Sequence, residues 1–363
     1  ADRFLNNKEF SNLPRKFNVT ITGCLENCSH SETQDLGMTQ AVHRSDGAPG
    51  FNAMVGGKMG SGGMTVAQPL DVFVEPSEAA RLAAKITLLF RDEGSREQRT
   101  KNRLAFLIRD WGIDRFRSCL EQRWGPPLEV AQQDARTSSQ TDHLGVHPQR
   151  LPGLDSVGLC VPTGRLTSEN LDGLAWLADT YGNGELHLTT GQNVILINVD
   201  RAKTAELLRE PLLKEFQPDA HPFFRGLVTC TGTDYCNLAL IETKSIWKSL
   251  AGSMAKQFPF GVPANMYWSG CPAGFGNHLV ADIGFQGAKA RVNGEIVDAV
   301  SIFVGGRTGT DASPGEKIME LVPVAVLGEV VPVILKNLET LRNLRRDHET
   351  KERIVMVPAV SAA

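Results

Sequence analysis

The chain contains an internal repeat. Residues 21–37 (ITGCLENCSHSETQDLG) align with residues 268–284 (WSGCPAGFGNHLVADIG), and VGGKMG at 55–60 matches VGGRTG at 304–309. Four positions of the first pair recur at a constant offset: Gly23, Cys24, Asp35 and Gly37 become Gly270, Cys271, Asp282 and Gly284. A repeat of this length predicts that the chain folds as two copies of one α/β unit.

Periodic segments predict the elements of these copies. Residues 77–90 (SEAARLAAKITLLF) place Leu82, Ile86, Leu89 and Phe90 on one helical face, with Ser77 as the N-cap. The apolar residues 321–335 carry Glu329 and are too few to span a bilayer. They predict a buried helix, or a strand followed by a helix.

The region between the copies predicts a different unit. Residues 131–150 are polar and are expected to form a linker. A strand at 156–162, a helix at 168–182, two strands around Gly191 and a helix capped by Asp200 follow. This order is most of a split βαβ, ferredoxin-like unit. We therefore expect an α+β protein, with these parts: 1–130 first copy, 131–154 linker, 155–215 ferredoxin-like half-domain, 216–355 second copy and 356–363 tail.

Three cysteines of the second copy indicate a metal centre. Cys230 and Cys236 form a Cys-x5-Cys pair, and Cys271 is followed by proline. Thiolates hold iron–sulfur clusters, and a four-iron cluster takes four of them. A Cys-x3-Cys turn would supply the fourth at position 275, which is Phe275. The alternative is that the three are ordinary buried thiols.

The cysteine motifs resemble those of the sirohaem-containing nitrite and sulfite reductases. Further matching motifs extend from NLPRKFNV (12–19) to VGGR (304–307), so the resemblance covers nearly the whole chain. The resemblance implies a sirohaem, a 4Fe-4S cluster held by Cys230, Cys236 and Cys271, and an oxidoreductase of nitrate assimilation. It also implies a second ferredoxin-like half, which is expected before residue 1, so the chain is expected to lack an N-terminal part. Only the second copy has Cys-x5-Cys, so the first is expected to be cluster-free; the alternative is that Cys24 and Cys28 bind a metal of their own.

The resemblance also suggests substrate and cofactor residues. If the NLPRKFN segment is extended, the side chains of Lys16 and Asn18 lie on the same face. They would then bind an oxyanion as catalytic residues. The alternative is an ordinary solvent-exposed strand. In the family, asparagine at this second position is typical of nitrite reductases and a basic residue of sulfite reductases. The expected sirohaem-binding residues are Arg15, Arg150, Arg165, Gln192, Asn193 and Arg307. His187 replaces a family arginine.

The expected reaction is six-electron reduction of nitrite to ammonia with reduced ferredoxin as donor. Basic runs that could meet an acidic ferredoxin lie at 95–103 (Arg96, Arg99, Lys101, Arg103) and 343–353 (Arg345, Arg346, Lys351, Arg353). The alternatives are a sirohaem sulfite reductase, or an inactive or fragmentary member because of Phe275.

Charge and cysteine content limit the other partners. The net charge of −3 argues against nucleic acid, and no membrane segment is expected. An odd number of cysteines, seven, favours a reducing compartment over disulfides. We expect a monomer in the cytoplasm of a bacterium or cyanobacterium, or in a chloroplast stroma.

Overall fold

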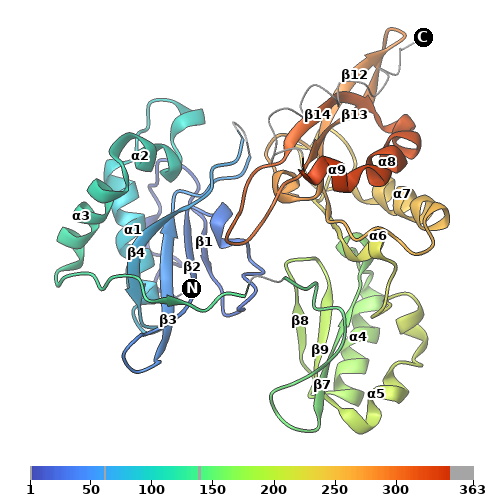
Figure 1. The fold of residues 1–363 in the computed structure, drawn as a ribbon, viewed down its shortest axis with the longest axis horizontal. Helices are drawn as coiled ribbons and strands as arrows, with labels where there is room; N and C mark the ends of the chain where they lie inside the picture. Colours follow the sequence, from blue (N-terminus) through green and yellow to red (C-terminus); the bar gives the residue numbers. More distant parts are fainter. Residues whose placement is uncertain (1, 61–62, 138–139, 344–363) are drawn as a thin grey trace. The chain divides into compact units, whose positions relative to one another are not determined.

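The computed structural model describes residues 2–60, 63–137 and 140–343. The chain divides into two compact units: the first is residues 1–140 with 307–314, and the second is residues 141–306 with 315–363. Figure 1 colours both along the sequence. No helix in the described ranges has the length and apolar character needed to cross a membrane.

The first unit is a sheet covered by helices on one face. Its strands run in the order β1-β2-β3-β4, with β1 parallel to β2 and the other neighbours antiparallel. The strands are β1 (Val19–Ile21), β2 (Leu36–Val42), β3 (Pro49–Val55) and β4 (Gln68–Val74). Helices α1 (Ala79–Glu93), α2 (Leu104–Trp111) and α3 (Ile113–Trp124) pack against it (Figure 1).

Helix α1 buries the predicted face. Leu82, Ile86, Leu89 and Phe90 are all buried in the core of the first unit, as the spacing of apolar residues predicted. The predicted N-cap is wrong, because α1 begins at Ala79 and Glu78 occupies the cap position without a side-chain cap. Burial of the apolar stripe therefore sets this helix, and capping does not.

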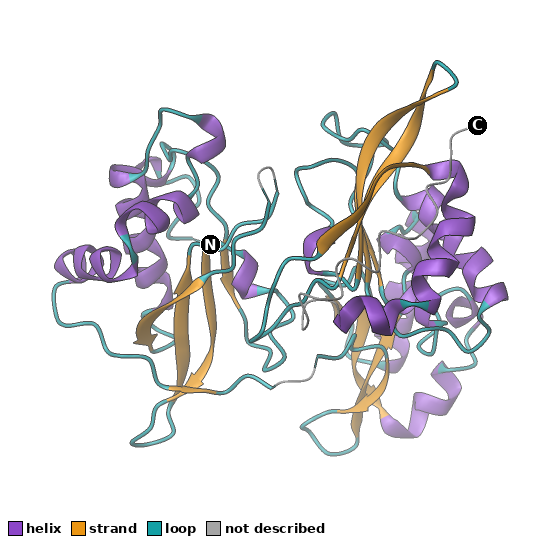
Figure 2. Cartoon of the chain, turned by 45° about the horizontal axis from the view of Figure 1, so that its top comes forward, coloured by secondary structure: helices purple, strands orange, loops and turns teal. Residues whose placement is uncertain are grey.

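The ferredoxin-like half-domain lies in the second unit. Its antiparallel sheet has the order β6-β7-β9-β8, with helices α4 and α5 on one face (labelled in Figure 1; helices and strands are coloured apart in Figure 2). The elements are β6 (Gly145–Pro148), β7 (Leu154–Leu159), α4 (Ser168–Tyr181), β8 (Leu186–Leu188), β9 (Val194–Asp200) and α5 (Arg201–Leu207). Asp200 caps α5 as predicted, because its side chain accepts a hydrogen bond from the Ala202 amide at 3.0 Å.

The stretch expected to be a linker is partly structured, so residues 131–154 are not a simple connection. Strand β5 (Gln133–Asp134) pairs with β2, and β6 pairs with β7. Backbone hydrogen bonds to existing strand edges supply the order here, although the segment has little apolar character of its own.

The rest of the second unit contains the other large sheet, in the order β10-β11-β12-β13-β14. The strands are β10 (Leu227–Thr229), β11 (Met266–Ser269), β12 (Ile283–Val292), β13 (Glu295–Val304) and β14 (Glu316–Pro323). The helices are α6 (Pro222–Arg225), α7 (Lys244–Gln257), α8 (Leu327–Lys336) and α9 (Leu338–Asn343). In its core the Trp268 and Phe285 rings stack, and Trp247 packs against both at an angle. The apolar stretch 321–335 forms the end of β14 and most of α8, so the strand-plus-helix alternative was right.

The two large sheets share one pairing scheme, which supports the predicted repeat. A parallel pair followed by two antiparallel pairs occurs in β1-β2-β3-β4 and again in β11-β12-β13-β14. The repeated aspartates make the same contact: the amide of Asn18 donates to Asp35 Oδ2 at 2.8 Å, and that of Asn265 donates to Asp282 Oδ2 at 2.8 Å.

The same close backbone contact explains why both copies have a glycine at this position, Gly37 in the first and Gly284 in the second. A Cβ added at Gly37 would lie 2.6 Å from the Ser31 carbonyl oxygen, and one at Gly284 would lie 1.9 Å from that of His278. In both copies a short turn therefore crosses so close to the strand that no side chain fits.

Candidate functional site

The cluster cysteines begin at one sheet edge in the second unit. Strands β10 and β11 are parallel, with Thr229 opposite Trp268. Cys230 directly follows β10, and Cys271 follows β11 after Gly270. Because the carboxyl ends of parallel strands meet at the same edge, the topology brings two of the three predicted ligands to one place.

The loop that carries Cys236 folds back onto this edge. The Gly270 amide donates to Cys230 Sγ at 3.0 Å, and the Leu240 amide donates to the Gly270 carbonyl oxygen at 2.8 Å. Cys230, Cys236 and Cys271 are all partly accessible. The thiolate is the form of cysteine that binds iron.

The three cysteine sulfurs are not gathered around a single ion. Cys230, Cys236 and Cys271 do not form a group whose ligand atoms lie within 4.8 Å of one another in the described residues. A cluster separates its ligand sulfurs more widely than one tetrahedral ion does, because each sulfur binds a different iron. The spacing therefore argues against a mononuclear site.

The fourth ligand position does not fit a thiolate-held cluster. Phe275 follows the Cys271 turn, in which the Gly274 amide faces the Cys271 carbonyl oxygen at 3.4 Å, and the Phe275 residue is 68% exposed. A phenyl ring has no lone pair to donate to iron. The residues present thus fit a cluster held by three cysteines and do not fit ligation by four.

His278 does not replace the missing ligand. It is 1% exposed, its Nδ1 lies 2.9 Å from Ser269 Oγ, and its ring packs against Phe303. Burial lowers the pKa of His278 to about 4, so the imidazole is neutral at physiological pH. It lies in the core and braces the turn after β11.

Two predicted cofactor residues bind backbone groups in the second unit, one in β10 and one just after β7. The Gln192 side chain donates to the Thr229 carbonyl oxygen at 2.7 Å and accepts from the Thr229 amide at 3.1 Å. Asn193 is buried, and its Oδ1 accepts from the Val161 amide at 2.9 Å. Both amide groups are thus engaged with backbone, one of them next to Cys230.

Arg165 points towards the cysteine loop. Its Nη2 lies 2.7 Å from Asp234 Oδ2, and its guanidinium lies 5.9 Å from the Tyr235 ring centre. The sequence argument missed a second cation nearby, Lys244, whose Nζ contacts the Thr163 carbonyl oxygen. Burial, followed by repulsion from Arg165, lowers the pKa of Lys244.

The predicted substrate residues, Lys16 and Asn18, lie in the first unit, just before β1. Between Lys16 and Asn18, the Phe17 ring packs on Phe90 in the core. Alternation along an extended chain would turn Lys16 and Asn18 to the opposite side, and their shared face stays a prediction. Partial burial, followed by repulsion from Arg103, lowers the pKa of Lys16.

A buried ion pair holds this segment. Asp35 Oδ1 accepts from Arg103 Nε at 2.9 Å, Asp35 Oδ2 accepts from Arg103 Nη2 at 2.6 Å, and the Asn18 amide also donates to Oδ2. Lys58 is a further buried cation, and burial, followed by repulsion from Arg103, lowers its pKa. The prediction that Arg103 belongs to a docking face is wrong, because its side chain is 8% exposed.

The remaining predicted residues lie at the surface. Arg150 is exposed, and Arg307 Nη1 lies 3.3 Å from Asp311 Oδ2. His187 is also exposed. Of the second basic run, Arg345, Arg346, Lys351 and Arg353 lie outside the described residues.

Comparison with known families identifies both parts of the chain. The family described as "Nitrite and sulphite reductase 4Fe-4S domain" matches residues 1–128 and 221–357, so one description covers both copies. The family described as "Nitrite/Sulfite reductase ferredoxin-like half domain" matches residues 147–213. The second match begins at residue 147, within strand β6, so it includes the last part of the segment that was expected to be a linker.

Individual relatives agree with these matches. A ferredoxin–nitrite reductase of Synechococcus elongatus is 46% identical over 92% of this chain, and a chloroplastic one of Arabidopsis thaliana is 38% identical over 94%. The solved structure of the Mycobacterium tuberculosis NirA protein matches with a TM-score of 0.88 at 28% identity over 96% of this chain. The chain spans 64%, 59% and 66% of these three proteins, respectively.

Proposed function

The chain belongs to the nitrite and sulphite reductase 4Fe-4S domain family, and from this we propose that it acts in the ferredoxin-dependent reduction of nitrite to ammonia. The observation that supports this most is the 38–46% identity, over more than nine-tenths of the chain, to proteins named ferredoxin–nitrite reductase. Asn18, beside Lys16, agrees with nitrite rather than sulfite as the oxyanion.

The proposed reaction consumes one nitrite, six electrons and eight protons, and releases ammonium and two waters. Sirohaem would supply the iron at which the anion is reduced, and an iron–sulfur cluster would supply electrons one at a time. In the first unit, Lys16 and Asn18 would bind and orient the anion. Partial burial lowers the pKa of Lys16, so it releases a proton more readily than a fully hydrated lysine does.

The cofactor contacts are proposed residue by residue within each unit. In the first unit, Arg15 and Arg307 would neutralise carboxylates of the sirohaem, and in the second unit Arg150 and Arg165 would do so. Gln192 and Asn193 are also proposed to contact the cofactor. Asn193 would in addition hold the backbone just before the turn that presents Arg165, at Val161, and Gln192 would hold Thr229, beside Cys230. Cys230, Cys236 and Cys271 would hold three irons of a cluster.

A second candidate function follows from Phe275. With only three thiolates at the cluster position, the chain would bind nitrite in the family fold and turn over slowly, or not at all, with ferredoxin as the donor. Phe275 favours this reading, whereas the similarity to the relatives favours an active reductase.

The proposed partners follow from the relatives' names and the charged surface. Reduced ferredoxin would dock on the exposed cations Arg96, Arg99 and Lys101 of the first unit. The relatives include cyanobacterial and chloroplastic proteins, so a cytoplasmic or stromal location is proposed. We also propose that the chain acts as a monomer.

Turnover measurements test the proposal. Protein loaded with cofactors is assayed for nitrite and sulfite reduction, with reduced ferredoxin and, separately, with a small viologen donor. Nitrite turnover with both donors supports the reductase, and turnover with neither supports the inactive candidate. Preference for sulfite would contradict the substrate assignment.

A pair of variants tests the role of Asn18. Asn18→Lys should shift relative turnover towards sulfite, because a second cation suits the more highly charged anion. Val19→Lys is the matched control, since it adds the same charge at an exposed neighbouring position of β1. Equal shifts in both variants would assign the effect to general charge and remove the specific role of Asn18.

A further inference from the structure

Cys24 and Cys28 bring their sulfurs together in the first unit. The two Sγ atoms lie 3.0 Å apart. A turn in which the Asn27 amide donates to the Cys24 carbonyl oxygen at 3.1 Å sets this approach, and Asn27 has the left-handed φ of 52°. The Cys24 amide is anchored to Thr22 Oγ1 at 3.2 Å. The approach is therefore built into the backbone of the loop.

The sulfur separation favours a covalent bond over a shared metal ion. A disulfide bond is about 2.05 Å long, so the sulfurs need to close by about 1 Å. A tetrahedral zinc ion, with Zn–S bonds of about 2.3 Å, holds its sulfurs about 3.8 Å apart, so zinc would have to push this pair apart. A rotation of two half-buried side chains is the smaller change.

The loop between the two cysteines anchors other parts of the first unit. The carbonyl oxygens of Leu25 and Glu26 accept hydrogen bonds from the Thr137 amide and from Gln140 Nε2, both at 2.9 Å. The Asn27 side chain donates to buried Glu32 at 2.5 Å.

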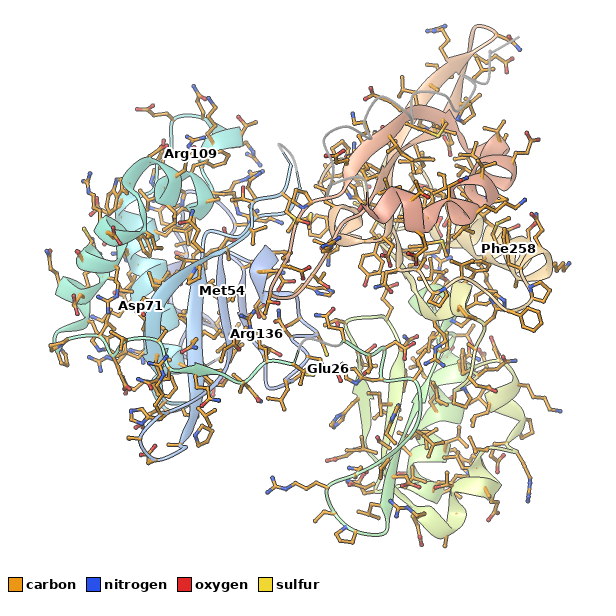
Figure 3. All side chains as sticks on the ribbon, in the orientation of Figure 1. Glu26, Met54, Asp71, Arg109, Arg136 and Phe258 are labelled. Carbon is orange, nitrogen blue, oxygen red and sulfur yellow. The ribbon has the colours of Figure 1, made fainter. Side chains whose placement is uncertain are left out.

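Glu32 extends this network to a distant part of the sequence. Its Oε1 accepts a hydrogen bond from the Gly309 amide at 2.9 Å. Glu26, Asn27 and Arg136 line a polar hollow here, and Figure 3 labels Glu26 and Arg136 in the first unit. The stiffness of the five-residue loop thus bears on Thr137, Gln140 and Gly309, whose hydrogen bonds end in this network.

We propose that Cys24 and Cys28 form a reversible dithiol–disulfide couple that tightens the hold of their loop on Thr137, Gln140 and Gly309. The oxidant is a low-molecular-weight disulfide such as oxidised glutathione. Its S–S bond breaks, the Cys24–Cys28 bond forms, and the two electrons and two protons of the thiols leave as two molecules of reduced thiol.

The environment of Cys28 sets the order of the exchange. Burial, followed by the hydrogen bond with Cys24, raises the pKa of Cys28 to about 12, so Cys28 is protonated at neutral pH. Exchange therefore starts at Cys24, and closure by Cys28 is the slower step.

Peptide mapping tests the couple directly. The full chain is equilibrated in glutathione buffers from reducing to oxidising, quenched in acid, unfolded, alkylated and digested with trypsin. Both cysteines fall in one tryptic peptide, residues 17–44, which has no internal lysine or arginine. The expected result is loss of both alkyl groups together with a mass lower by two hydrogens, reversed by a thiol reductant. The Cys160 peptide, residues 151–165, is the control and should stay alkylated throughout.

Two results would overturn the couple: alkylation of both cysteines across the whole buffer range, or glutathione retained on either cysteine without closure. Zinc ions added alone should not protect the pair from alkylation in the folded protein, and protection by zinc would assign the site to metal. Cys28→Ser should trap one glutathione on Cys24, whereas Cys119→Ser, in α3, should leave closure intact.

Amide hydrogen exchange tests the consequence for the loop. Oxidation should slow exchange at Thr137 and Gly309, whose amides donate into the Cys24–Glu32 network, and leave the β12–β13 ladder unchanged. Unchanged exchange at both amides in fully oxidised protein would refute the proposed effect on Thr137 and Gly309, even with the disulfide formed.

Discussion

Replacing Asp35 with asparagine should strongly destabilise the first unit. Asp35 is fully buried and accepts three hydrogen bonds, two from Arg103 and one from the Asn18 amide. Asparagine keeps the shape but removes the charge, and it turns a donor towards one of these donors. Arg103, whose side chain is 8% exposed, would then be a buried cation without its carboxylate partner.

The magnitude follows from the pair's geometry. At the Arg103 Nη2–Asp35 Oδ2 distance of 2.6 Å, an effective dielectric of about 20 corresponds to about 6 kcal/mol of attraction. Dehydration of both groups offsets part of this, and breaking a buried pair by removing one partner typically costs about 3–5 kcal/mol. We expect Asp35→Asn to lower the free energy of unfolding by that amount.

Urea unfolding, followed by circular dichroism and by amide exchange in β2 and β3, measures the loss. Asp110→Asn is the control, because the Arg109–Asp110 pair is about 60% exposed on both sides and should be worth less than about 1 kcal/mol. A loss for Asp35→Asn as small as that of the control would refute the argument from burial.

Removing the other partner of the ion pair, by Arg103→Met, should change how stability depends on pH. Burial raises the pKa of Asp35 while Arg103 opposes this shift, so Arg103→Met leaves the carboxyl with a pKa further above its unfolded value. A carboxyl group whose pKa is higher in the folded protein than in the unfolded chain binds its proton more tightly in the folded protein, so its protonation stabilises the fold. The destabilisation of Arg103→Met should therefore shrink as pH falls from 7 towards 4, and a constant difference would contradict this assignment.

Three further predictions concern the second unit. Because burial lowers the pKa of His278 from 6.5 to about 4, protonation favours the unfolded chain. Stability should thus fall by about 3 kcal/mol between pH 6.5 and pH 4, and His278→Gln should flatten this slope in urea titrations. Phe275→Cys should add a fourth thiolate, so a reconstituted cluster should show a more stable four-iron absorption and paramagnetic resonance spectrum than the parent; equal lability would show that Phe275 is not the defect. Gly284→Ala would place a Cβ 1.9 Å from the His278 carbonyl oxygen and should cost about 1–3 kcal/mol in thermal unfolding, whereas Gly252→Ala, at an open position of α7, should not meet such a clash.

Patterns that repeat or alternate in the sequence predicted the fold well. The Gly–Asp spacing of the two copies corresponds to real backbone contacts, Asn18 to Asp35 and Asn265 to Asp282, so the repeat could be read from residue identity alone. The α+β class and the ferredoxin-like half followed from apolar periodicity and from the Asp200 cap. Each of these signals lies within a few residues of the feature that it specifies.

Features set by distant contacts could not be read in this way. Strands β5 and β6 are short and polar, and they are ordered by the edges of β2 and β7. Arg103 stands in a run of basic residues, and its contact with Asp35, 68 positions away, is what turns it inward. Lys244 was missed for the same reason, since its partner Thr163 is 81 positions away. A local charge pattern does not show which cation is buried.

At the sheet edge that carries Cys230 and Cys271, the contacts that position the backbone are different from the side chains that could bind a cluster. Cys230 is placed by the ladder between β10 and β11 and by the two hydrogen bonds of Gln192 to Thr229, none of which needs a metal. Phe275 is 68% exposed, so its ring contributes little to the core. A change from cysteine to phenylalanine there removes a ligand at almost no cost in folding free energy. The contacts that place the cysteine edge therefore do not depend on the residue at position 275, and we expect substitutions there to leave this edge in place.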